Sequence, residues 1–116
     1  MTGAILGDVV GSVYEFGHIK TKEFTLDEIR PAYDFDISCH GTLPPAMQAF
    51  FESTDFEDAI RNAISIGGDS DTIGAITGAV AEAYYGIPDE LKKTALSYLD
   101  ERLLCIVKKF EEKYSA

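Results

Sequence analysis

The chain has 116 residues, of which 46% are hydrophobic and 26% are charged. These values are typical of a folded protein, and the length suits one domain with a modest core rather than two. Twenty acidic residues against ten basic ones give a net charge of −10, which disfavours binding to nucleic acid or to a membrane surface. No apolar run approaches the ~20 residues that a membrane span needs.

The cellular compartment is predicted from the first residues and from the cysteines. The N-terminal stretch carries acidic residues and lacks the basic leader of a signal peptide. Cys39 and Cys105 lie far apart and belong to no metal-binding or disulfide pattern. We therefore expect a cytoplasmic protein with two free thiols.

The first predicted element is an amphipathic helix over residues 3–16, because its apolar side chains recur three and four residues apart. One face carries a glycine every fourth residue, at Gly3, Gly7 and Gly11. Glycine weakens a helix, so such a stripe indicates that another backbone packs very close to it. Residues 17–42 follow as a long irregular connection with at most one helical turn, at 26–29.

Five further helices are predicted. The first begins at Leu43, with Pro44 and Pro45 in its first turn. The next is capped by Asp55 and ends at Gly67. The others span 72–85, 89–99 and 101–114. No alternating strand pattern competes with them, so the chain is expected to be a single all-α domain over 1–116, a compact multi-helix bundle.

Two of these helices are expected to bury particular faces. Helix 72–85 is rich in small residues and has one charged residue after its start, so we expect it at the centre of the bundle. The last helix is expected to bury one apolar face, made of Leu103, Ile106 or Val107, Phe110 and Tyr114.

The segment with the clearest chemistry precedes the central helix. It reads Gly67-Gly68-Asp69-Ser70-Asp71-Thr72. Two carboxylates and a hydroxyl within four residues are suitable oxygen ligands for a hard divalent cation, and the glycines allow a sharp bend with room for a ligand. The alternative is that Asp69, Ser70 or Asp71 merely caps the helix, and spacing alone favours this cap.

A second candidate is Glu15, at the end of the first predicted helix. A carboxylate there could transfer protons or complete a metal site. Composition alone favours an ordinary surface glutamate.

Three stretches of the sequence resemble the ADP-ribosylglycohydrolase family. GAILGDVVGSVYEF is similar to the N-terminal signature of that family, and ISIGGDSDTIGAITGAVAEAYYG to its C-terminal metal signature. SCHGTLPPAMQAFFEST resembles the helix that precedes the C-terminal signature in family members. The chain is thus identified as a shortened member of this family of all-α hydrolases, which remove ADP-ribose from conjugates.

The resemblance implies a function and a set of site residues. It implies a binuclear Mg²⁺ or Mn²⁺ site whose ligands include Asp69, Asp71 and Thr72. It implies a catalytic role for Glu15 and ADP-ribose or an ADP-ribosylated substrate as the ligand. Contacts to that ligand are implied for six residues, namely Ser38, Gly41, Thr42, Gly67, Gly68 and Ser70.

The chain also departs from the family pattern. Members are much longer and carry a second acidic cluster, Thr-Asp-Asp-Thr, which supplies the other half of the metal shell. No such cluster occurs here, and the internal part of the family fold is expected to be absent around residues 24–28. Asp27, Glu28, Asp34 and Asp36 could substitute, although solvated loop acids are the simpler interpretation.

The shortened chain leaves two hypotheses for function. One is a magnesium-dependent hydrolase of ADP-ribosyl conjugates. The other is a catalytically impaired remnant that binds metal or ADP-ribose weakly or acts in assembly. Loss of the middle of the bundle is also expected to expose the small-residue faces of helices 3–16 and 72–85, and therefore to favour a homo-oligomer.

Overall fold

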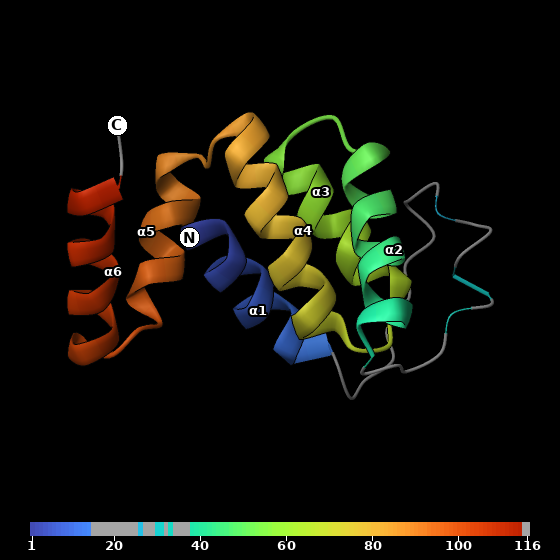
Figure 1. Ribbon diagram of the computed structural model, residues 1–116, viewed down its shortest axis with the longest axis horizontal. Coiled ribbons are helices and arrows are strands. Elements are labelled where there is room, and N and C mark those ends of the chain that lie inside the picture. Colours follow the sequence, from blue (N-terminus) through green and yellow to red (C-terminus); the bar gives the residue numbers. More distant parts are fainter. Residues whose placement is uncertain (15–25, 27–29, 32, 34–37, 115–116) are drawn as a thin grey trace.

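The computed structural model describes residues 1–14, 26, 30–31, 33 and 38–114, except for the side chains of residues 11–14 and 40. In this part of the chain all regular structure is α-helical, which confirms the predicted fold class. The helices, in chain order, are α1 (Thr2–Tyr14), α2 (Cys39–Phe51), α3 (Phe56–Ile66), α4 (Ser70–Tyr85), α5 (Asp89–Ser97) and α6 (Glu101–Tyr114) (Figure 1). None of the helices described is long and apolar enough to cross a bilayer.

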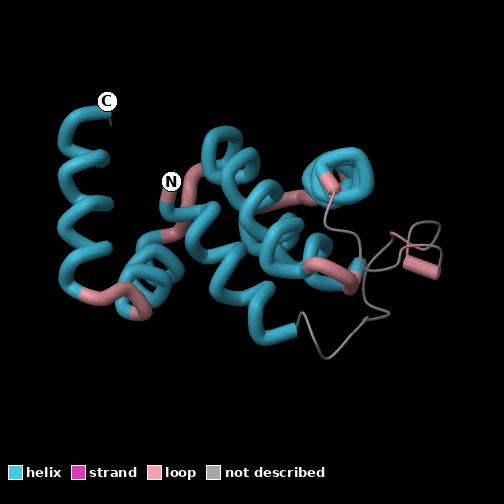
Figure 2. Tube along the Cα trace, turned by 60° about the horizontal axis from the view of Figure 1, so that its bottom comes forward, coloured by secondary structure: helices cyan, strands magenta, loops and turns pink. Residues whose placement is uncertain are grey.

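Helix α4 lies at the centre, as its small side chains predict, with α1, α2 and α3 packed against it. Helix α5 packs on α1. Helix α6 stands at the outer edge of the molecule beside α5, at the opposite end from α2, and both views agree on this (Figures 1 and 2).

Short polar and glycine signals set the ends of these helices. The carboxylate of Asp55 accepts a hydrogen bond from the backbone N–H of Asp58 at 2.7 Å and so caps α3. Gly67, with φ of 79°, ends that helix, and Gly86, with φ of 77°, ends α4. Asp100 accepts from the N–H of Leu103 at 2.8 Å at the start of α6.

The core consists of two clusters, and α3 and α4 contribute residues to both. The first lies between α1, α3, α4 and α5 and contains Leu6, Phe56, Ala59, Ile60, Ile64, Ala81 and Ala95. The second joins α2, α3 and α4 to Leu26 and contains Ala46, Ala49, Ala63, Ile66 and Ile73. The amphipathic stripe of α3 supplies residues to both clusters, so this helix connects the two halves of the bundle.

Helix α2 begins four residues earlier than predicted. Ser38 is its N-cap: the Ser38 hydroxyl accepts from the N–H of Gly41 at 3.1 Å, and the Ser38 carbonyl accepts from the hydroxyl of Thr42 at 2.7 Å. Pro44 and Pro45 therefore lie inside the helix rather than in its first turn. The cap at Ser38 starts the helix, whereas the prolines alone suggested a later start.

The glycine faces of α1 and α4 are not exposed, which corrects in part the expectation from the shortened chain; Ala79 and Ala83 of α4 do remain exposed. The two glycine faces cover each other: Gly3 lies against Gly78, and Gly7 against Gly74, backbone to backbone. A Cβ added at Gly74 would lie 2.9 Å from the carbonyl carbon of Gly7 and closer still to its oxygen. A homo-oligomer stays a prediction, but this face does not require one.

The burial predicted for α6 is also largely wrong. Val107 alone of the apolar residues in the expected set is buried, at 4% exposed. The others remain on the surface, with exposed fractions of 47% for Leu103, 53% for Ile106, 44% for Phe110 and 63% for Tyr114. The helix is amphipathic as predicted, but within the described chain nothing else packs over most of its apolar face.

Candidate functional site

The glycine contacts fix the relative direction of α1 and α4. Because Gly3 faces Gly78 while Gly7 faces Gly74, the two helices are antiparallel, and the last turn of α1 lies beside the first turn of α4. Helix α2 runs along α4 as well, since the Thr77 hydroxyl donates to the carbonyl of Ala46 at 3.0 Å. The first turns of α2 and α4 and the last turn of α1 thus meet at one end of the bundle, at the bottom of Figure 1.

The turn of residues 67–72, here called the acidic turn, enters α4 at this end. Gly67 and Gly68 both adopt positive φ values, 79° and 68°, which side chains rarely allow. The carbonyl of Gly68 accepts from the backbone N–H of Ser70 at 2.9 Å and from its hydroxyl at 3.4 Å. Residues 67–70 are all buried, so the turn is held against the interior rather than projecting into solvent.

The two aspartates of the acidic turn differ in surroundings. Asp69 stands at the N-cap position of α4 and is only 6% exposed, yet its side chain makes no capping hydrogen bond. Asp71 is half-buried, and its Oδ1 accepts from the backbone N–H of Thr72 at 2.8 Å. Thr72 is exposed, with its hydroxyl 3.5 Å from the same Oδ1. Helix capping therefore does not explain why the Asp69 side chain is buried. The carboxylate of Asp71, in contrast, is partly occupied by its hydrogen bond from the N–H of Thr72.

These side chains are only a partial match to the metal centre that the resemblance implies. Asp69, Asp71 and Thr72 offer two carboxylates and one hydroxyl, whereas magnesium takes about six oxygen ligands. Among the described residues, no group of three or more His, Cys, Asp or Glu side chains is placed to hold a metal ion. The acidic turn fits one side of a single coordination shell and does not by itself fit a pair of ions.

A further carboxylate near the acidic turn, at Asp8, was not predicted as a site residue. Asp8 follows Gly7, and the contact of Gly7 with Gly74 brings it toward the start of α4. The loss of solvent beside the neighbouring helix, and next the negative charge of Asp71, raise the pKa of the Asp8 carboxyl above its ordinary value. The matching four-residue glycine spacing in α1 and α4 is the sequence signal that could have placed Asp8 there.

The other predicted residues are placed as follows. Ser38, Gly41 and Thr42 lie at the start of α2, where the Ser38 hydroxyl accepts from the N–H of Gly41 and the Ser38 carbonyl accepts from the hydroxyl of Thr42. Thr42 is buried, while Ser38 is exposed. Glu15 lies outside the described residues. The substrate contacts and the catalytic role suggested for these positions remain predictions.

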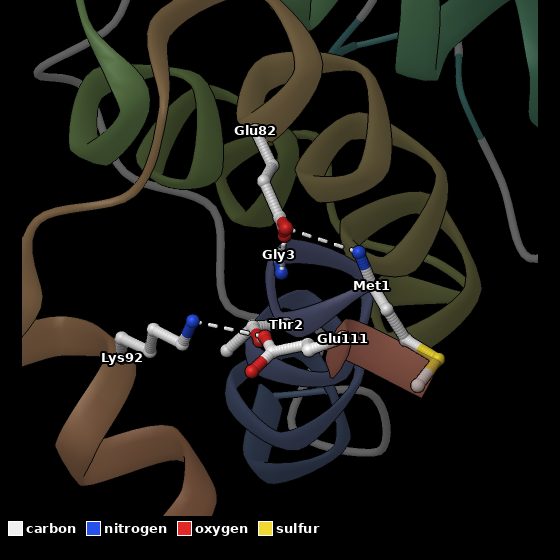
Figure 3. Close-up of polar contacts among 6 residues, drawn as sticks. All are labelled: Met1, Thr2, Gly3, Glu82, Lys92 and Glu111. Carbon is white, nitrogen blue, oxygen red and sulfur yellow. Dashed lines mark hydrogen bonds and ion pairs between the residues drawn. The ribbon is translucent and has the colours of Figure 1, made fainter. Parts of the chain in front are cut away.

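A second set of carboxylates lies at the opposite end of α4 (Figure 3). Glu82 accepts from the amino group of Met1 at 3.0 Å and from the backbone N–H of Gly3. Glu111 accepts from the hydroxyl of Thr2 at 3.2 Å and pairs with Lys92 at 2.9 Å. Because negative charge is favoured at a helix N-terminus, both side chains hold the start of α1 in place.

The charge state of Glu111 follows from these contacts. The hydrogen bond from Lys92, together with the one from Thr2, lowers the pKa of the Glu111 carboxyl despite some loss of solvent. The signal for Glu82 is visible in the sequence, since it is the sole charged residue of α4 beyond the first turn. These contacts stabilise the fold and lie away from the acidic turn.

Comparison with known proteins places the chain in a family. The sequence model of the ADP-ribosylglycohydrolase family matches residues 20–115. The ADP-ribosylarginine hydrolase Tri1 of Serratia proteamaculans is 42% identical over 66 residues, which are 56% of this chain and 17% of that protein. An uncharacterized protein of Archaeoglobus fulgidus is 39% identical over 54 residues, 46% of this chain and 18% of that protein.

The matched segments thus span less than a fifth of either curated relative. No solved structure matches the chain. The family match, however, includes the acidic turn and all of α2 to α6. Because it covers well over half of the residues, the chain belongs to the ADP-ribosylglycohydrolase family.

Proposed function

We propose that this chain removes ADP-ribose from a conjugate and that its acidic turn helps to hold a divalent cation for this reaction. Family membership supports the reaction class, and the name of the Serratia relative supports an ADP-ribosyl conjugate as substrate. The observation that carries the proposal is the position of Asp69. Asp69 is only 6% exposed and stands at the N-cap position of an apolar helix, yet its carboxylate accepts no capping hydrogen bond from that helix.

The roles follow from the chemistry of each side chain. Asp69 and Asp71 would offer carboxylate oxygens to magnesium or manganese, and Thr72 its hydroxyl. When bound, the cation would orient the ribose hydroxyls and a water molecule. Gly67 and Gly68, which lack side chains, leave the backbone open to a ligand at this turn.

The remaining roles rest on the resemblance. Glu15 is proposed to take a proton from the water whose oxygen bonds to the anomeric carbon and to give a proton to the acceptor as its bond to that carbon breaks. Ser70 and the first turn of α2, with Ser38, Gly41 and Thr42, are proposed to contact the ADP-ribosyl group. The meeting of the first turns of α2 and α4 at one end of the bundle supports a common ligand for Ser70 and the α2 residues.

The experiment is release of ADP-ribose from ADP-ribosylarginine in the presence and absence of Mg²⁺ or Mn²⁺. We expect metal-dependent release that falls at least a hundredfold in Asp69→Asn and Asp71→Asn. Glu57→Gln is the matched control, because it removes one negative charge from an exposed position of α3. Release that is unaffected by both aspartate variants would refute the assigned role of the turn.

The second candidate is a member of the family that binds cation or ADP-ribose weakly without turnover. The observation in its favour is that, among the described residues, no third carboxylate, histidine or cysteine completes a metal-binding group with Asp69 and Asp71. Calorimetry with Mn²⁺ and with ADP-ribose separates the two. Binding that depends on Asp69 without any release of ADP-ribose would favour this second function.

A further inference from the structure

The exposed side of α6 is an apolar feature that the proposed function leaves unexplained. Its side chains are spaced three, four and four residues apart and form one continuous stripe, here called the α6 stripe: Leu103, Ile106, Phe110 and Tyr114. The rings of Phe110 and Tyr114 touch, with centroids 4.8 Å apart. Contiguous exposed apolar surface of this kind is typical of an interaction site.

The rotation of α6 is fixed, so the stripe does not turn toward its own molecule. Val107 is buried at 4% exposed, and Glu111, four residues further on the same face, is tied to Lys92 and to Thr2. These contacts define the inward face of the helix. The exposed α6 stripe lies on the adjacent face of this helix. The helix itself stands at the outer edge of the molecule (Figures 1 and 2).

A row of positive charge runs along the outer border of the α6 stripe. Arg102, Lys109 and Lys113 are all exposed and are spaced seven and four residues apart, so they share one side of the helix. The ammonium of Lys113 lies 5.3 Å from the centre of the Tyr114 ring and so borders the stripe directly. We call these three residues the basic row.

The basic row contrasts with the rest of this acidic protein. Six of its ten basic residues lie between Lys92 and Lys113, with four of its twenty acidic ones. This segment therefore has a net charge of +2 in a chain whose net charge is −10, and its apolar stripe has a positive border. Surfaces that associate tend to have complementary potentials, so the charge of the border limits what can cover the stripe.

We propose that the α6 stripe is a docking site for an amphipathic helix, from another protein, that carries acidic residues along one edge. Its apolar side chains would pack on Ile106 and Phe110, in the way that an amphipathic helix lies on an apolar helix face. Its acidic edge would pair with the basic row. Association would then depend on both the apolar contact and the salt concentration.

A second copy of this chain fits the stripe less well. Two α6 helices packed antiparallel about a twofold axis would place the basic row of one copy beside the basic row of the other. Each chain also has a net charge of −10, so their overall fields repel. A parallel pair would instead place the basic row of each helix beside the inward face of the other, which is already occupied by its own molecule.

The test uses the whole chain and two fluorescein-labelled 18-residue helical peptides. Both have the same leucine stripe, and one edge carries glutamate in the first peptide and lysine in the second. We expect fluorescence anisotropy to show the acidic peptide binding at least tenfold more tightly than the basic one at 50 mM NaCl. We expect this preference to shrink at 500 mM NaCl.

Three variants connect the binding to the stripe and the row. Phe110→Asp should weaken binding of the acidic peptide at least tenfold. The double change Lys109→Glu with Lys113→Glu should reverse the preference between peptides. Lys108→Glu is the matched control and should leave it unchanged, because Lys108 lies two residues from both Ile106 and Phe110 and so falls off the stripe. All four positions are exposed, and circular dichroism checks that the variants fold.

Several outcomes would overturn the proposal. Equal binding of the two peptides would contradict the pairing of an acidic edge with the basic row. Binding of neither peptide would contradict docking of a helix on the α6 stripe. Binding that survives Phe110→Asp would place the contact elsewhere. A wild-type dimer in light scattering that Phe110→Asp converts to monomer would assign the stripe to a second copy of this chain instead.

Discussion

Replacing Gly74 with alanine tests the backbone contact that organises the bundle. Helix propensity alone predicts that Gly74→Ala stabilises the chain by about 1 kcal/mol, because alanine orders a helix more readily than glycine. The packing predicts the opposite. The new Cβ would lie 2.9 Å from the carbonyl carbon of Gly7 and 3.3 Å from its Cα, and closer still to the carbonyl oxygen.

The size of the effect follows from those distances. Carbon atoms pack best at about 3.5–4.0 Å, so α1 and α4 must separate by roughly 1 Å at this point. The neighbour is backbone, which cannot turn aside as a side chain would. Overpacking of a core costs about 1–3 kcal/mol, and a rigid neighbour places this site at the upper end. After the gain in helix propensity is subtracted, we expect Gly74→Ala to lower the free energy of unfolding by about 2 kcal/mol and Tm by about 8 °C.

The assay is urea unfolding followed by circular dichroism, with Ala79→Gly as the control. Ala79 is exposed on the same helix, so its variant measures propensity alone and should lose about 1 kcal/mol. The double variant Gly7→Ala with Gly74→Ala should lose clearly less than the sum of the single losses, because one separation of the helices accommodates both methyl groups. A stabilised Gly74→Ala would refute the close approach of the two backbones.

Two further predictions concern carboxylates on or against α1. Because the pKa of Asp8 is raised in the folded chain, its favourable contribution is present below the unfolded pKa and is lost as the pH rises through the folded value. Asp8→Asn should therefore be more stable than wild type at pH 7 in EDTA, and this difference in stability should shrink as the pH falls toward 3.8. Thermal melts measure the difference, and one that grows on acidification would contradict the prediction. Glu82→Gln should lose about 1 kcal/mol in urea unfolding, the typical loss for a helix-start contact, while Glu112→Gln, at an exposed position of α6, should lose almost nothing.

The sequence predicts the helices well because their signals are local. The apolar stripe of α3, the caps at Asp55 and the glycines at 67 and 86 each act within a few residues, and the structure places helix ends at them. The start of α2 was missed because two signals compete there. Ser38 begins the helix, while Pro44 and Pro45 suggested a later start.

What the sequence could not predict is which faces meet. The glycine stripes of α1 and α4 were recognised separately, and their exposure was inferred from the shortened chain rather than from their complementarity. The stripe of α6 was likewise assigned to the core, because an amphipathic pattern shows that a helix has an apolar face without showing what covers it. The glycine spacing and the lone charge of α4 mark Asp8 and Glu82 in the sequence, but the residues that these two carboxylates meet depend on the same long-range packing.

The glycine contact also determines the geometry of the candidate site. Asp71 lies three residues before Gly74, and Asp8 directly follows Gly7, so the distance between their carboxylates depends on how closely the two helices approach. A side chain at either glycine would move the acidic turn away from α1 as well as weakening the core. The small residues of α1 and α4 therefore serve two purposes: they give a short chain a dense centre, and they hold negative charge together at the end of the bundle where a cation is proposed to bind.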